Sequence, residues 1–331
     1  MTGKLDPDAL APLLSATGVE DAAVLQGAAY GEDAAAIDLG DRILVVSADP
    51  LSLAAEAVGR LAVHVACNDV AASGADPRWL TNTVFVPDDD PAIRETIAEQ
   101  VDRAAREASV AIVGGHTEVL PALERPLLSM TAFGVTDRYL PSGGAEPGDR
   151  LLLTKGAAIE ATAILATDFR EACLAAGVSA GTLDAAASFL DEVSVIEDAR
   201  ALRDVATAMH DPTEGGLLSA LVEMAAASDR VLSVERERVP VRPETRACCD
   251  ALGVDPLATF GSGSLLVAVP MERVDDALAA LDGVGIEGAV IGEVQADDDA
   301  EGGPDVESGT VVLDGDPIRE APRDECYPLW E

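Results

Sequence analysis

Acidic and glycine residues recur in five short segments, each expected at the end of a strand or at the start of a helix. The segments are residues 31–37 (GEDAAAI), 47–50 (SADP), 68–77 (NDVAASGADP), 114–118 (GGHTE) and 211–216 (DPTEGG). Carboxylates at separate strand ends can converge on Mg²⁺, a hard cation that takes oxygen ligands. Glycine allows backbone N–H groups to approach a phosphate closely. Together, the segments indicate a site for a phosphate compound held through Mg²⁺.

Each segment taken alone has a simpler interpretation. The chain carries 60 acidic residues against 22 basic ones, so a single aspartate is more often a solvated surface residue or a helix cap. A single Gly-Gly pair is more often a turn. Only the combination of the segments and their order along the chain favours the functional interpretation.

The elements that must position these segments are strands and helices that alternate along the chain. Hydrophobic runs predict strands at residues 42–48, 79–86, 109–113, 127–135, 151–154, 264–269 and 289–294. Apolar residues predict helices at residues 53–73, 91–108, 198–208, 217–227 and 272–281. The Pro/Gly-rich stretch LPSGGAEPGDR at residues 140–150 is expected to be a linker. The fold class is therefore mixed α/β or α+β.

The charge balance limits the partners of this protein. Its net charge is −38, its pI is near 4.1, and its only lysines are Lys4 and Lys155. Like charge repels nucleic acids and anionic membranes, so neither is an expected partner. The acidic residues are spread along the whole chain, which we interpret as a halophilic adaptation to a cytoplasm of molar salt.

Two further features bear on the compartment. No apolar stretch approaches the ~20 residues of a membrane-spanning helix, and the N-terminal region lacks the apolar run of a signal peptide. The five cysteines include no CxxC pair, which argues against a disulfide framework and against a structural zinc site. We therefore expect a cytoplasmic protein.

The five segments resemble, in order and type, those of a superfamily of ATP-dependent enzymes. It includes AIR synthase, selenophosphate synthetase, thiamine-monophosphate kinase and the hydrogenase maturation factor HypE. These proteins carry a GDDAAV-like segment, a T-D strand end, an N/S-D-x-A-x-x-G-A-x-P helix, a GG-x-T/S turn and a D-x-T-x-G loop. Here the same order is followed by residues 260–264 (FGSGS). DPTEGG and GSGSLL are most similar to HypE and to archaeal AIR synthase-related proteins.

The resemblance implies roles for individual residues. It implies that Mg²⁺ is bound by four aspartates, Asp33, Asp49, Asp69 and Asp211. It implies that ATP is lined by Asn68, Gly114, Gly115, Thr117, Thr213, Glu214, Gly215 and Gly216. Lys155 follows a strand and precedes a helix, a position that suits a phosphate contact. His116 and Glu118 are candidate catalytic residues, with packing in the turn and a surface carboxylate as the respective alternatives.

The resemblance also implies the organisation of the chain. It implies a two-domain AIR-synthase-like fold, with an N-terminal domain at residues 1–138 and a C-terminal α/β domain at residues 149–296. Residues 297–331 are expected to form an acidic loop and the C-terminal tail. The N-terminal sheet would pair with that of a second subunit in a homodimer, and ATP would lie in the groove between the domains.

The expected activity is Mg²⁺-dependent use of ATP to phosphorylate, and so activate, an oxygen of an unidentified small-molecule or protein substrate. The alternative is a non-catalytic regulator or maturation scaffold that binds ATP. HypE ends in a cysteine that receives a carbamoyl group. Here Cys326 is followed by YPLWE, so we do not expect its thiol to insert beside ATP.

Overall fold

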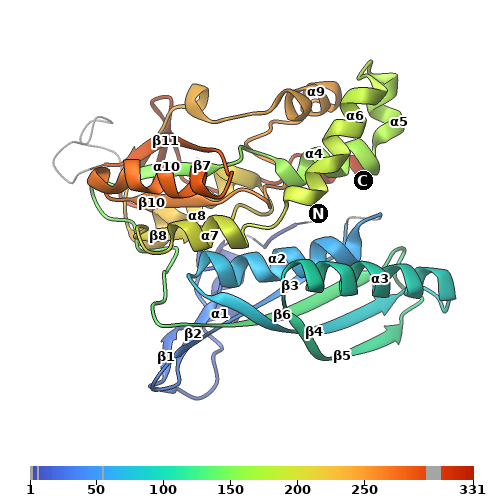
Figure 1. The fold of residues 1–331 in the computed structure, drawn as a ribbon, viewed down its shortest axis with the longest axis horizontal. Helices are drawn as coiled ribbons and strands as arrows, with labels where there is room; N and C mark the ends of the chain where they lie inside the picture. Colours follow the sequence, from blue (N-terminus) through green and yellow to red (C-terminus); the bar gives the residue numbers. More distant parts are fainter. Residues whose placement is uncertain (1–2, 6, 54–55, 296–306) are drawn as a thin grey trace.

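The computed structural model describes residues 3–5, 7–53, 56–295 and 307–331, which form two β-sheets with helices packed against them (Figure 1). The first sheet has the order β1-β2-β3-β6-β4-β5, and all its neighbours are antiparallel except the parallel pair β4–β5. Its strands are β1 (Val24–Gln26), β2 (Ala35–Asp38), β3 (Ile43–Leu51), β4 (Asp76–Val86), β5 (Ala111–Val119) and β6 (Leu127–Thr136).

Two helices cover one face of the first sheet, and a third precedes it. They are α2 (Val58–Ala72), α3 (Pro91–Glu107) and the N-terminal α1 (Pro7–Leu14). Helix α3 is amphipathic, and Asp90 caps it by accepting a hydrogen bond from the Ala92 N–H at 2.9 Å. Helix α2 is apolar almost all around, and it lies between the first sheet and the second half of the chain (Figure 1).

The second sheet has the order β13-β12-β9-β11-β7-β10-β8. Its strands are β7 (Arg150–Thr154), β8 (Ala208–His210), β9 (Leu232–Val234), β10 (Leu266–Val269), β11 (Gly288–Val294), β12 (Val311–Leu313) and β13 (Asp316–Ile318). The helices of this half are α4 (Ile159–Thr167), α5 (Arg170–Ala175), α6 (Ala180–Ala187), α7 (Ile196–Leu202), α8 (Gly216–Ser228), α9 (Pro243–Leu252) and α10 (Val274–Gly283). Short 3₁₀ helices lie at Ser188–Glu192, Arg236–Arg238, Met271–Arg273 and Tyr327–Leu329.

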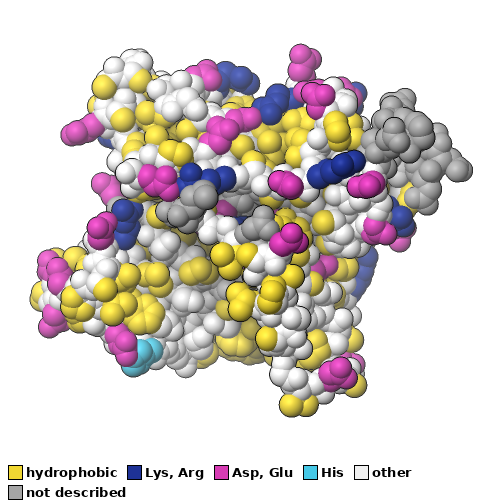
Figure 2. Space-filling view, turned by 180° about the vertical axis from the view of Figure 1, so that it is seen from behind, with side chains coloured by type: hydrophobic (Ala, Val, Ile, Leu, Met, Phe, Trp, Pro, Cys, Tyr) yellow, Lys and Arg dark blue, Asp and Glu magenta, His cyan; other side chains and the backbone are white. Residues whose placement is uncertain are grey.

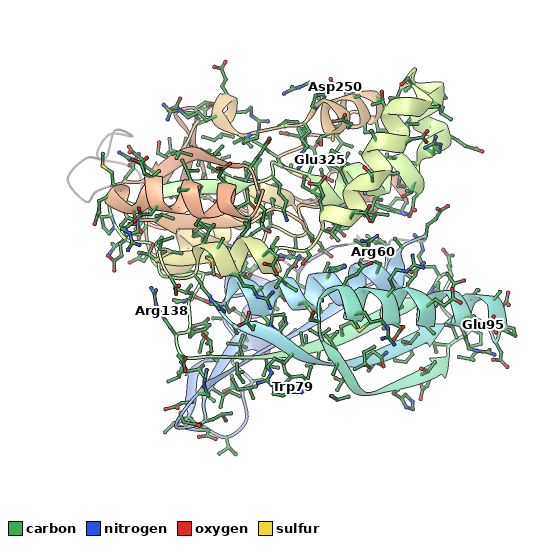
Figure 3. All side chains as sticks on the ribbon, viewed as in Figure 1. Arg60, Trp79, Glu95, Arg138, Asp250 and Glu325 are labelled. Carbon is green, nitrogen blue, oxygen red and sulfur yellow. The ribbon has the colours of Figure 1, made fainter. Side chains whose placement is uncertain are left out.

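The two halves share a hydrophobic core. One cluster joins Val70 of α2 and Leu80 of β4 to Ile196 of α7 and Val267 of β10. Arg138, in the chain between the two sheets, donates to the backbone oxygens of Arg203 and Ala206, and it points toward the second half (Figure 3). The mixed α/β class predicted from the sequence is confirmed by these two sheets and their helices.

Some sequence expectations differ from the structure. Residues 114–118 were expected in a turn after a short strand, but they lie inside the longer strand β5, paired in parallel with β4. Helix α2 begins at Val58 rather than at residue 53. Within residues 297–331, the segment 297–306 is outside the described residues, and β12 and β13 extend the second sheet instead of forming a tail. In the described part of the chain, no helix is long and apolar enough to cross a membrane.

Candidate active site between the two halves

Three of the four predicted metal aspartates converge where the halves meet. Asp33 precedes β2, Asp69 lies in the last turn of α2, and Asp211 follows β8. One carboxylate oxygen of each lies within 4.8 Å of the others, the spacing of ligands around one cation. Asp49 of β3 is close enough for its charge to act on Asp69. Residues 178 positions apart in the sequence thus meet at one point.

The electrostatics of this cluster favour a bound cation. Burial and the charge of Asp49 raise the pKa of Asp69 well above its usual range. Burial and the charge of Asp33 do the same for Asp211. Both carboxylate oxygens of Asp211 are buried without a hydrogen-bond partner, whereas Asp69 accepts a short hydrogen bond from Ser47. A divalent cation would relieve the repulsion and satisfy the Asp211 oxygens.

A chain of charged groups adjoins the aspartates. His210 Nδ1 lies 2.7 Å from Asp33 Oδ1, and its Nε2 lies 3.0 Å from Glu223 Oε2. Lys4 Nζ completes the chain at 3.1 Å from Glu223 Oε1. Burial by itself lowers the pKa of His210, but the charges and hydrogen bonds of Asp33 and Glu223 together outweigh this effect and raise it to about 10. Burial likewise opposes ionisation of Glu223, yet Lys4 and His210 lower its pKa to about 2.

The sequence analysis did not assign roles to His210, Glu223 or Lys4. His210 immediately precedes the DPTEGG segment, which was a usable signal. Glu223 lies within α8, whose sequence is that of an apolar core helix. Lys4 is more than 200 residues away from Glu223 in the sequence. Only the folded chain shows that the three side chains form one chain of contacts.

Asp33, Asp49 and Asp69 line a cavity of about 690 Å³. Among the described residues, seven carboxyl side chains line it, and the cationic or potentially cationic lining residues are Lys4 and His210. The carboxyl groups are those of Glu32, Asp33, Asp49, Asp69, Glu160, Glu214 and Glu223. An anionic ligand can therefore enter this cavity only together with cations.

A further lining carboxyl group to which the sequence analysis assigned no role is Glu160. Glu160 stands in the first turn of α4 and is 3% exposed. Burial raises its pKa to about 7, with Ser262 acting in the opposite direction and Asp324 and Glu214 adding to the rise. These neighbours differ from Asp33, Asp49 and Asp211, which act on Asp69. The cavity therefore carries two separate groups of carboxyl side chains.

The DPTEGG loop contributes two of its predicted residues to the cavity, Thr213 and Glu214. Gly215 and Gly216 are not lining residues. Both have positive φ (75° and 61°), and the Gly215 N–H donates to Asp324 Oδ2 at 2.8 Å. Any Cβ on Gly216 would meet the backbone of Thr259. These two glycines shape the loop and start α8 rather than contact a ligand in this chain.

Two residues that were predicted to contact the nucleotide contact other parts of the chain in this structure. The Asn68 side chain is fully buried, donates to the Val193 carbonyl at 2.8 Å and accepts from the Val195 N–H at 2.9 Å. It joins α2 to the second half and does not line the cavity. A nucleotide contact by Asn68 stays a prediction, and in this structure both ends of its amide are already used by Val193 and Val195.

Lys155 is the second of these residues. Its ammonium lies 2.9 Å from Asp198 Oδ2 and donates to the backbone oxygens of Ser194 at 2.6 Å and Glu192 at 3.2 Å. These three partners occupy its donors, and Lys155 is not a lining residue of the cavity. The phosphate contact by Lys155 stays a prediction, and in this structure its side chain anchors the segment before α7.

The GGHTE segment lies away from the cavity of its own chain. Gly114, Gly115, His116, Thr117 and Glu118 are all exposed on the edge strand β5. His116 Nε2 and Glu118 Oε1 are 3.0 Å apart on this surface. Position 115 requires a glycine for a structural reason, because a Cβ there would collide with Asn82 of β4. Within one chain, none of these residues contacts the aspartate cluster.

Comparison with known proteins places this chain in a family. The sequence matches the N-terminal domain of AIR synthase related protein at residues 31–136 and its C-terminal domain at residues 146–303. The carbamoyl dehydratase HypE of Rhizobium leguminosarum bv. viciae is 30% identical over 291 residues, covering 81% of this chain and 78% of the relative. The chain belongs to the AIR synthase-related superfamily. It is an enzyme of that superfamily.

Further AIR synthase-related proteins show the same relationship. A putative hydrogenase expression/formation protein of Methanocaldococcus jannaschii is 29% identical over 262 residues, covering 76% of this chain and 75% of the relative. The structure of Escherichia coli HypE is 27% identical, with a TM-score of 0.70 over 86% of this chain and 87% of that one. Thiamine monophosphate kinase of Aquifex aeolicus, 21% identical with a TM-score of 0.70, shares the fold.

The C-terminal residues of this AIR synthase-related protein are packed into its second half. The Cys326 side chain is buried, the Thr259 hydroxyl donates to its sulfur at 2.8 Å, and burial raises the pKa of the thiol to about 12. Trp330 packs edge-to-face against Phe169 and Phe260. Cys326 is therefore a protonated core thiol, in agreement with the expectation that it does not insert beside a nucleotide.

Proposed function

We propose that this protein is an ATP-dependent enzyme that binds Mg²⁺–ATP in the cavity between its halves and phosphorylates an oxygen of its substrate. The observation that carries the proposal is the convergence of Asp33, Asp69 and Asp211 within 4.8 Å, with Asp49 beside them. Carboxylates drawn from both halves of the chain, at the mouth of a cavity of about 690 Å³, suit a metal-bound triphosphate.

The donor set fits magnesium. All the converging side chains offer hard carboxylate oxygens, and the two unpartnered oxygens of Asp211 are free to coordinate. Asp33, Asp49, Asp69 and Asp211 would hold the metal, which when bound supplies positive charge that offsets the transferring phosphoryl group. His210 orients the Asp33 carboxylate by their 2.7 Å contact, and the Ser47 hydroxyl orients that of Asp69.

The comparisons support ATP as the nucleotide. A HypE solved in complex with ATP is 26% identical to this chain, with a TM-score of 0.67 over 95% of this chain and 90% of that one. The resemblance described above implies that HypE proteins use their own C-terminal cysteine. In this chain the Cys326 side chain is buried in the core. We therefore assign this protein an external substrate rather than its own C-terminal cysteine.

We further propose a homodimer of two-domain subunits, with domains at residues 1–138 and 149–296, that pair through the first sheet. On the face opposite α2 and α3, Val46, Phe133 and Trp79 lie in one row across β3, β6 and β4. Trp79 points away from the helices (Figure 3), and hydrophobic side chains are frequent on the lower half of the surface in Figure 2. The exposed edge strand β5 would bring residues 114–118 toward the partner subunit.

Calorimetric titration with Mg²⁺–ATP tests the nucleotide proposal. Asp69→Asn keeps the size of the side chain but removes a charge that would neutralise the metal, so we expect affinity to fall by about 100-fold, equivalent to roughly 3 kcal/mol. Asp41→Asn, at an exposed turn, is the matched control and should bind as the parent does. Equal Mg²⁺–ATP affinity in the parent and in Asp69→Asn would overturn the proposal.

Release of ADP distinguishes an enzyme from the alternative, a regulator or maturation scaffold that only binds ATP. The assay measures ADP in molar KCl with Mg²⁺ and a set of candidate substrates. We expect at least one substrate to raise ADP release in the parent and not in Asp69→Asn. Binding of Mg²⁺–ATP without substrate-dependent ADP release would favour the regulator.

A further inference from the structure

The segment at residues 322–327 packs against the DPTEGG loop, which carries Asp211 of the aspartate cluster. The side chain of Asp324 is 2% exposed, and its Oδ2 accepts a hydrogen bond from the Gly215 N–H at 2.8 Å. The two backbones are also in direct contact, because a Cβ on Gly215 would lie 2.8 Å from the Pro322 carbonyl oxygen. Segments 109 positions apart in the sequence are thus joined at this loop.

Asp324 is itself fixed by its other oxygen. Oδ1 accepts a hydrogen bond from the Cys326 N–H at 2.9 Å and lies 3.2 Å from the Thr259 hydroxyl oxygen. The next residue fixes the backbone as well, because the Glu325 N–H donates to the Ala258 carbonyl at 3.0 Å. Asp324 therefore has one oxygen on a fixed part of the second half and the other on the loop.

The hydrogen bond to the loop is made by a charged acceptor. Burial raises the pKa of Asp324 to about 6, while the N–H groups of Gly215 and Cys326 act in the opposite direction. The carboxylate is therefore mostly ionised at neutral pH, and a hydrogen bond to a carboxylate is stronger than one to a neutral acceptor. Without this acceptor the Gly215 N–H would be left unsatisfied, so the loop would have to move to find another partner.

The position of this loop decides what the cavity presents to a ligand. Asp211 begins the loop, and Thr213 and Glu214 line the cavity. Gly215 ends the loop directly before α8, with a φ of 75°. A shift at Gly215 therefore moves the two lining residues, and it moves Asp211 through them. A displacement of about 1 Å in a functional group can cost on the order of 100-fold in function.

We propose that Asp324 is a positioning residue of the nucleotide site. It acts through the Gly215 N–H and holds the DPTEGG loop so that Asp211 reaches the bound cation. This inference rests on the proposed function, in which Mg²⁺–ATP binds at the aspartate cluster. Asp324 is not among the lining residues of the cavity, so its effect on the nucleotide is exerted through the loop.

Asp324→Asn tests the contact, because the amide keeps the size of the side chain but loses its charge and one of its two acceptor oxygens. In the apoprotein we expect amide exchange across residues 211–217, measured by mass spectrometry, to accelerate by about tenfold. Calorimetric titration should show an affinity for Mg²⁺–ATP that is lower by about tenfold or more. Parental affinity in folded Asp324→Asn, or unchanged exchange in the loop, would overturn the proposal.

Thr245→Val is the matched control for a purely structural loss. Thr245 is fully buried in the second half, does not line the cavity, and lies 2.8 Å from the Thr162 hydroxyl. Its replacement should lower the free energy of unfolding but leave both the loop exchange and the Mg²⁺–ATP affinity as in the parent, at temperatures where the variant is folded. An equal loss of affinity in Thr245→Val would refute a specific role for Asp324.

A measurement on the parent covers the case in which Asp324→Asn does not fold. Mg²⁺–ATP should slow amide exchange in residues 211–217 and in residues 322–327 together, because the contact between Gly215 and Asp324 joins them. Slower exchange in the loop alone would contradict the proposal. Failure of the proposed function has a different signature, which is a parent that does not bind Mg²⁺–ATP, and the exchange comparison between the apoproteins then still tests the contact.

Discussion

Single carboxyl groups in this protein have ionisation states that depend on their neighbours in space as well as on burial. Glu160 has a pKa raised by burial to about 7, whereas Glu223, equally buried, has a pKa of about 2 because Lys4 and His210 outweigh its burial. Both are glutamates on helices of the second half, yet at neutral pH Glu223 is ionised whereas Glu160 is only partly ionised. Their partners in space, rather than their sequence neighbours, decide the difference.

The raised pKa of Glu160 predicts a pH-dependent loss of apoprotein stability. The folded state holds the Glu160 proton up to about pH 7, whereas the unfolded chain releases it near the ordinary value of 4.5. Stability from this group is therefore complete below pH 4.5, falls as the pH rises to 7, and is lower above that by about 3 kcal/mol. Glu160→Gln should remove the decline and stabilise the apoprotein at pH 8.

Denaturant unfolding at pH 5 and pH 8 in constant KCl measures this effect, with Glu171→Gln as the control for general charge removal. The difference in unfolding free energy between the two pH values should be smaller in Glu160→Gln than in the parent and in the control. An equal difference in all three proteins would contradict the assignment of a buried, partly protonated Glu160.

At the scale of elements, an ion pair ties α7 to the residue that follows β7. Lys155 is 10% exposed and Asp198 is 1% exposed, and they lie 2.9 Å apart. Lys155→Gln leaves Asp198 with a buried, unpaired charge, so we expect a loss of about 3 kcal/mol in unfolding free energy. Affinity for Mg²⁺–ATP should not change at temperatures where the variant is folded.

Chemical denaturation and calorimetric titration of Lys155→Gln give the two readouts. Arg106→Gln, which breaks an exposed pair with Asp102 on α3, is the control and should leave stability nearly unchanged. A large loss of nucleotide affinity in a stable Lys155→Gln protein would restore the phosphate contact that the sequence suggested.

The apolar face of the first sheet predicts that the protein forms a homodimer. Phe133→Glu places a charge in the middle of the row formed with Val46 and Trp79, so we expect a dimeric parent and a variant that is a monomer of 34.0 kDa. Leu174→Glu, at a partly exposed apolar position on α5 in the second half, is the matched control and should stay dimeric. Light scattering in high salt measures both. A monomeric parent at micromolar concentration would contradict the dimer.

For the whole molecule, the net charge of −38 predicts that stability depends on salt. Repulsion among dense surface carboxylates is screened when the Debye length falls to about 3 Å at molar salt. We expect the melting temperature to rise from low KCl to about 2 M KCl, and to rise less in non-ionic sucrose at equal osmolality. A melting temperature that is flat or falls with KCl would refute the halophilic interpretation.

The sequence by itself determined the fold class and the positions of the acidic segments. Alternating hydrophobic runs and amphipathic helices are local patterns, and they predicted mixed α/β structure that the two sheets confirm. The resemblance of the motifs to those of the superfamily implied Asp33, Asp49, Asp69 and Asp211, and the folded chain brings these side chains together. Local sequence was sufficient for the elements because strand ends and helix starts are encoded within a few residues.

Only the tertiary structure decided which polar groups face the cavity. Lys4 reaches Glu223 across 219 positions, and the Glu160 N–H donates to the Ser262 carbonyl, contacts that no local pattern encodes. The same long-range packing pairs Lys155 with Asp198 and places Gly114 and Gly115 in β5 beside β4. Burial, pairing and shared cavities arise from segments distant in the chain, so they are properties of the packed molecule rather than of any single motif.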